Sequence, residues 1–134
     1  MQATGLPETV VQAWGPEVAN DFLTWLEERM RATAFISQIH ISAFVARQKV
    51  NVLMLERVSN LLLASEPRLT EAPDGSGVWH VPVDLTFPTH GRVGCVGEVE
   101  VDARYGEVHY DDALLTQIAH EAERLAQQTL HPTP

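Results

Sequence analysis

The most constraining feature of the chain is an alternation of apolar and polar residues between positions 78 and 108. In its first half Trp79, Val81, Val83, Leu85 and Phe87 occupy every second position. This period of two is typical of a β-strand with one buried face. The pattern resumes from residue 93 and continues through a turn to residue 108. It predicts a pair of antiparallel strands with a tight return turn, and it gathers no nucleophile, base and oxyanion site.

In the second half of this stretch the alternation assigns two faces. The apolar face would hold Val93, Cys95, Val99 and Val101, and the polar face would begin with Val96. Gly106 would supply the positive φ angle of the return turn. On this pattern Cys95 is a buried thiol that packs as a small hydrophobic residue, not a nucleophile.

Helical patterns flank the predicted strands. A first helix would begin at Pro16 and turn a stripe of five residues inward: Val18, Phe22, Trp25, Leu26 and Met30. Residues 35–41 are rich in β-branched side chains and predict a short strand. Ser42 is a plausible N-cap for a long helix over residues 43–64. Asp111 or Asp112 would cap a final amphipathic helix.

Together these elements predict an α+β fold. An antiparallel meander of three to four strands would pack against the long helix, with additional N- and C-terminal helices. A length of 134 residues favours a single domain, 1–134. Within it we expect an N-terminal helical extension over residues 1–33 and a core over residues 42–128.

The predicted long helix is apolar on more than one side. Beside its main stripe, Val45, Val52, Leu55 and Leu63 widen the apolar surface well beyond a single face. A helix of this kind is usually covered on two sides. One side would pack on the sheet, and the other would receive the first helix, a partner protein or a second copy. These four residues are therefore our candidate partner-binding residues.

The polar face of the predicted sheet carries His80, Asp84, Glu98, Glu100 and Asp102, with His109 nearby. Imidazole and carboxylate groups are zinc ligands, but no tight spacing such as His-x-x-x-His is present. A solvated polar face is the better interpretation. The glycines of residues 91–97 fit no phosphate-binding motif, and His120 with Glu121 do not face each other on a helix. We therefore predict no catalytic, cofactor-binding or metal-binding residue, and no enzyme activity.

Composition narrows the classes of partner. The formal net charge is −9, from 18 acidic and 9 basic residues, which disfavours nucleic-acid binding. A single cysteine excludes an internal disulfide and fits a reducing cytoplasm. No signal peptide is expected, and the apolar run Val50–Leu55 is too short to cross a membrane.

Two resemblances follow from short motifs. The segment Val99–Val108 resembles the VDA-x-TGEV return hairpin of PepSY-type domains, with Tyr105 where threonine is usual. The motifs at Ala46–Asn51, Glu66–Leu69 and Trp79–Val83 are similar to those of small bacterial proteins of cyanobacteria and related phyla. Some members of that group look like companions of PIN-domain nucleases, as antitoxins would be. The resemblances cover about residues 42–128 and imply no catalytic residue.

The sequence thus supports one first hypothesis and two alternatives. The first is a non-catalytic, acidic, cytoplasmic protein-interaction module, antitoxin-like or inhibitory. The alternatives are a PepSY-like regulator of a peptidase and a small ligand- or metal-binding domain that uses His80, Asp84 and Glu98. A homodimer would also bury the apolar surplus of the long helix.

Overall fold

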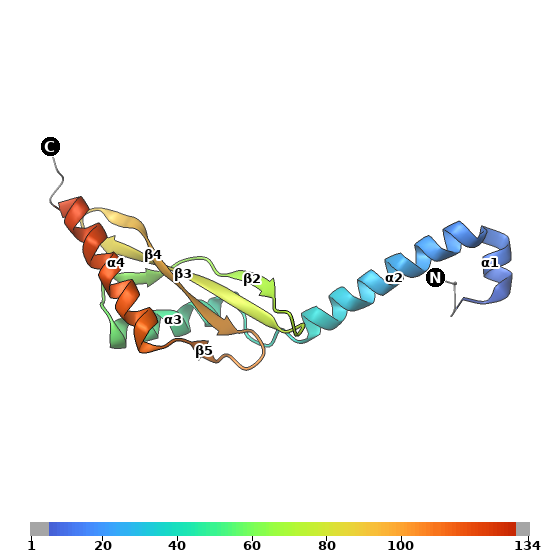
Figure 1. Ribbon diagram of the computed structural model, residues 1–134, viewed down its shortest axis with the longest axis horizontal. Coiled ribbons are helices and arrows are strands. Elements are labelled where there is room, and N and C mark those ends of the chain that lie inside the picture. Colours follow the sequence, from blue (N-terminus) through green and yellow to red (C-terminus); the bar gives the residue numbers. More distant parts are fainter. Residues whose placement is uncertain (1–5, 131–134) are drawn as a thin grey trace. The chain divides into compact units, whose positions relative to one another are not determined.

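The computed structural model describes residues 6–130 (Figure 1). The chain divides into two compact units at the Ser37/Gln38 boundary. We call the described parts the helical unit, residues 6–37, and the sheet unit, residues 38–130. The expected division into an extension over residues 1–33 and a core over residues 42–128 stays a prediction, with this boundary lying between its two parts.

The helical unit consists of α1 (Glu8–Trp14) and α2 (Pro16–Ser37). Gly15, with φ of 84°, turns the chain between them, and α2 begins at Pro16 as predicted. The rings of Trp14 and Phe22 meet edge to face at 5.6 Å. Because α1 has only seven residues, it covers just the first turns of α2 (Figure 1).

The inward stripe predicted for the first helix is wrong in part. Val18, Trp25 and Met30 are each more than half exposed, and Ala19 is the only buried residue of α2. A short α1 cannot enclose a helix of 22 residues, so most of the apolar side of α2 lies open.

The strand predicted over residues 35–41 is also wrong, because α2 continues through Ser37. No glycine or proline interrupts the helix after Pro16, and β propensity has little effect without a partner strand. The following segment is irregular but fixed to the sheet unit. The N–H groups of His40 and Ile41 donate to the carbonyl of Ala103 at 2.9 and 2.8 Å. The indole of Trp79 donates to the carbonyl of Ile41 at 2.7 Å.

The sheet unit has the predicted α+β fold, with five antiparallel strands where three to four were expected. The strands are β1 (Leu62–Ala64), β2 (Arg68–Glu71), β3 (Gly77–Phe87), β4 (Gly91–Asp102) and β5 (Val108–His109). Their order is β1-β3-β4-β5, and β2 pairs with the same edge of β3 as β1 does, further along. Pro82 lies where this edge partner changes from β2 to β1, which is where a missing N–H group is tolerated.

The long helix predicted over residues 43–64 is shorter than expected. It forms α3 (Ala43–Arg57), capped as predicted by the hydroxyl of Ser42, which accepts from the N–H of Val45 at 3.1 Å. Beyond Arg57 the N–H of Ser59 bonds back to Met54, and the hydroxyl of Ser59 accepts from the N–H of Leu61 at 3.1 Å. These local bonds end the helix, and residues 62–64 become β1 instead.

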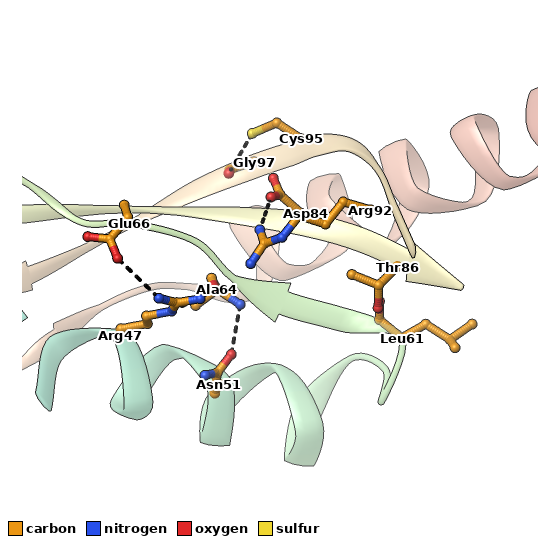
Figure 2. Close-up of polar contacts among 10 residues, drawn as sticks. All are labelled: Arg47, Asn51, Leu61, Ala64, Glu66, Asp84, Thr86, Arg92, Cys95 and Gly97. Atoms are coloured by element: carbon orange, nitrogen blue, oxygen red, sulfur yellow. Dashed lines mark hydrogen bonds and ion pairs between the residues drawn. The ribbon is translucent and has the colours of Figure 1, made fainter. Parts of the chain in front are cut away.

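Two side chains of α3 hold β1 in place (Figure 2). The amide oxygen of Asn51 accepts from the N–H of Ala64 at 2.7 Å, and Arg47 donates to the carbonyl of Ala64 at 3.0 Å. Arg47 also forms an ion pair with Glu66 at 3.3 Å. The motifs Ala46–Asn51 and Glu66–Leu69 therefore have a structural role. Arg47 and Asn51 satisfy backbone groups of the edge strand β1, and Glu66 pairs with Arg47.

Replacing Asn51 with alanine is expected to lower the free energy of unfolding by about 1–2 kcal/mol, because the N–H of Ala64 loses its partner in a buried position. The control is Gln48→Ala, which removes a contact to Asn51 but keeps the bond to Ala64, and should change stability by less than about 0.5 kcal/mol. Urea denaturation of both variants measures the difference. Equal effects would show that the contact to Ala64 is unimportant.

The helices α3 and α4 (Asp112–Leu130) supply side chains to one core with the inner face of β3 and β4. Asp111 caps α4, as predicted, by accepting from the N–H of Leu114 at 2.8 Å. Gly106 has the predicted positive φ, 77°. The fully buried side chains of the core include Val50, Met54, Val81, Val83, Val99, Val101 and Ile118.

The prediction that Cys95 is buried is wrong. The pairing of β4 with β3 shifts register twice, between the partners of Val83 and Asp84 and again between those of Leu85 and Thr86. Val96 is the extra residue at the first shift, and it is buried although the alternation placed it on the polar face. Each bulge adds a residue and reverses the alternation beyond it. Cys95 is consequently exposed, opposite Asp84.

Candidate functional site

The predicted polar face of the sheet exists on the side opposite the core, and we call it the open face. Cross-strand partners share a face, so the register places Arg68, His80, Glu100 and His109 in one row across β2, β3, β4 and β5. Asp84 lies further along β3 and pairs with Cys95. The sequence thus predicted this face, but not which of its groups meet.

His80 is bonded through both ring nitrogens. Its Nδ1 lies 2.8 Å from Glu98 Oε1, and its Nε2 lies 2.6 Å from the hydroxyl of Thr70. Glu98 also accepts a hydrogen bond from Arg68 at 3.4 Å. Glu100 lies farther from the imidazole, at 3.7 Å. The side chain of His80 is 19% exposed. It links β3 to both neighbouring strands, through Thr70 on β2 and Glu98 on β4.

The order carboxylate, imidazole, hydroxyl in Glu98, His80 and Thr70 is also that of a hydrolytic triad. A triad needs in addition a substrate pocket and fixed donors for an oxyanion. Three pockets of the sheet unit are lined by residues of α4, and none of these three includes Thr70. The contacts of the three residues across β2, β3 and β4 favour a structural role.

Asp84 does not join His80 and Glu98, so the predicted trio does not converge. Its carboxylate accepts a hydrogen bond from Arg92 on β4 (Figure 2). Only 14% of the Asp84 side chain is exposed. Cys95 donates to the carbonyl of Gly97 at 3.3 Å. Within residues 6–130, no three His, Cys, Asp or Glu side chains are grouped to hold a metal ion.

Two acidic residues of α4, Glu121 and Asp112, form contacts with arginines. Glu121 accepts two hydrogen bonds from Arg124 Nε at 3.1 and 3.2 Å, and this contact lowers the pKa of the Glu121 carboxyl below its ordinary value. Asp112 forms an ion pair with Arg57 at 3.5 Å. Glu121 is thus stabilised in its charged form, which does not favour proton transfer by this carboxyl near neutral pH.

A small apolar pocket lies between α4, the end of β3 and the segment that follows α3. Its volume is about 260 Å³, below the usual range for ligand sites, about 300–1,000 Å³. Leu61, Leu85, Phe87 and Ala122 are among its lining residues. This pocket was not predicted, because its lining residues Val58, Ser59, Leu61 and Leu62 were expected to belong to a helix over residues 43–64, whereas α3 ends at Arg57.

The side of α3 that faces away from the core is exposed and carries several large apolar side chains. Val45, Val52 and Leu55 lie there as candidate partner-binding residues, and Phe44 joins them. Their exposed fractions range from 40% to 68%. We call these four residues the outer face of α3. Phe44 was missed, although its spacing of eleven residues from Leu55 places both on the same side of a helix.

Leu63, the fourth candidate, is separated from this surface. It belongs to β1, where its neighbours Leu62 and Ala64 are buried, and it pairs with Asp84 on the open face. A strand alternates its side chains between two faces, so Leu63 points away from α3. The sequence placed all four on one helix, and the end of α3 at Arg57 divides them.

The sheet unit is therefore a two-layer α+β structure. On its open face His80 and Asp84 are bonded to neighbouring side chains, and on its helical side α3 carries exposed apolar residues. No protein-family model, no curated protein and no solved structure matches this chain. Among residues 6–130, no helix combines the length and the apolar composition needed to cross a membrane.

Proposed function

We propose that this chain is a non-catalytic protein-interaction module that binds another protein through the outer face of α3. It would act in the cytoplasm as an antitoxin-like or inhibitory partner. The observation that carries the proposal is the exposure of four apolar side chains on one side of α3, Phe44, Val45, Val52 and Leu55. Contiguous exposed apolar surface is typical of interaction sites.

The firm attachment of α3 supports this role. Ala46, Val50 and Met54 are fully buried on its other side, and Asn51 and Arg47 bind the backbone of β1. The outer face is therefore presented on a rigid helix, which keeps the entropic cost of binding low. An apolar groove on the partner would receive such a helix.

Charge and the open face support the same proposal. The net charge of −9 favours a partner whose groove is rimmed by basic groups, because opposite charges accelerate association. On the open face, His80 is bonded to Glu98 and Thr70, and Asp84 to Arg92, so these polar groups are used within the sheet.

The test is the affinity of the purified partner for single alanine variants. Val52→Ala and Leu55→Ala should each raise the dissociation constant by about 30-fold or more, as for residues at the centre of an interface. Gln48→Ala is the control, since it lies on the same exposed side of α3 and removes no apolar group. Unchanged affinity in both apolar variants would show that the partner binds elsewhere.

The class of partner is decided by activity. The resemblance to companions of PIN-domain nucleases makes nuclease activity the first activity to assay, and we expect this chain to inhibit it. Inhibition of a co-purified peptidase, without binding to a nuclease, would favour the PepSY-like alternative.

A further inference from the structure

The helical unit carries a second exposed surface, a straight line of residues along α2. Val18, Trp25, Arg29 and Ile36 are separated by seven, four and seven positions. At 100° per residue they lie within about 40° of one another on the helix. The three apolar members are each more than half exposed, and the guanidinium of Arg29 stacks on the ring of Trp25 at 5.3 Å. We call these four residues the α2 seam.

We infer that the α2 seam binds the α2 seam of a second copy of this chain in antiparallel orientation. The intervals between the seam residues, seven, four and seven, are the same when read from either end of the helix. An antiparallel copy therefore sets Val18 opposite Ile36 of the second copy and Trp25 opposite Arg29 of the second copy, on both sides of a twofold axis. Each tryptophan ring then meets an arginine from the other copy.

The charges of α2 favour this orientation. The first half of α2 has a net charge of −2, from Glu17 and Asp21, whereas the second half is neutral, because Arg29 and Arg31 balance Glu27 and Glu28. Antiparallel pairing sets the acidic half of each copy against the neutral half of the other. A parallel pair would place the two acidic halves beside each other and would leave Trp25 beside Trp25. One pair of helices buries a small area, so we expect a dissociation constant on the order of micromolar.

Disulfide trapping tests the orientation, in a Cys95→Ser background that removes the native thiol. A Val18→Cys chain mixed with an Ile36→Cys chain should form a covalent heterodimer under mild oxidation. The Val18→Cys chain alone should form almost none, since its two cysteines would lie about 27 Å apart at opposite ends of the pair. Self-linking of the Val18→Cys chain, or no linking in the mixture, would overturn the inference.

Sedimentation of the purified full chain tests the surface independently. Val18→Glu with Ile36→Glu should raise the dimer dissociation constant at least 30-fold. The control, Asn20→Glu with Thr24→Glu, adds the same charge on the opposite side of α2 and should change it less than threefold. Circular dichroism checks that the helix remains. A wild-type chain that stays monomeric up to 200 µM, or a dimer indifferent to the seam variants, would contradict the inference. Both results leave the proposed binding by α3 untouched.

Discussion

Replacing Ile118 with alanine is expected to lower the free energy of unfolding of the sheet unit by about 2–5 kcal/mol. Ile118 is fully buried, and it and Leu115 are the only buried residues of α4. Removing three methyl or methylene groups here leaves a cavity where the helix meets the sheet. The attachment of α4 therefore depends strongly on this side chain.

The measurement is urea denaturation followed by the fluorescence of Trp79, with Trp14 and Trp25 replaced by phenylalanine so that only the sheet unit reports. Leu55→Ala is the matched control, because Leu55 is a large aliphatic residue of the same unit that is 64% exposed. It should cost less than about 0.5 kcal/mol. Equal losses in the two variants would contradict the assigned core.

Replacing Gly97 with valine is expected to cost about 3 kcal/mol, the upper end of the usual range for overpacking. A Cβ atom at Gly97 would lie 2.7 Å from Cγ1 of Ile118, whose side chain is fully buried and has no room to move. Either α4 shifts away from β4, or both side chains adopt strained rotamers. The glycine is thus needed for the close approach of α4.

A double-mutant cycle separates this clash from a general effect on β4. Gly97→Val combined with Ile118→Ala should be more stable than the sum of the two single changes predicts, because the added side chain fills part of the cavity. Cys95→Val, on the exposed face of the same strand, should change stability little. Additive losses in the cycle would mean that Gly97 and Ile118 do not meet.

The sequence predicted the sheet best where one rule applies without interruption. In β3 the alternation correctly placed Val81, Val83 and Leu85 in the core. In β4 the same rule failed at Cys95 and Val96, because the register shift at Val96 reverses the alternation there. A bulge depends on pairing with the neighbouring strand, and a period of two within one strand carries no information about it.

Helix ends were the harder part of the prediction. The cap at Ser42 was predictable from its side chain, whereas the end of α3 at Arg57 depends on bonds made by Ser59 and on the pairing of residues 62–64 with β3. The wrong helix end also affected the candidate partner-binding residues, because it placed Leu63 on the helix. Val45, Val52 and Leu55 share the exposed surface that the helical period indicated, but Leu63 lies on the open face.

The most direct test of the proposed function is mass-resolved gel filtration of the tagged chain recovered from its own host. The wild-type chain is compared with a Val52→Asp/Leu55→Asp double variant and with the Gln48→Ala control. Our account predicts a stoichiometric foreign protein with the wild type and the control, and its loss from the double variant. The same complex on the double variant, or no foreign protein on the wild type, would contradict binding through the outer face of α3.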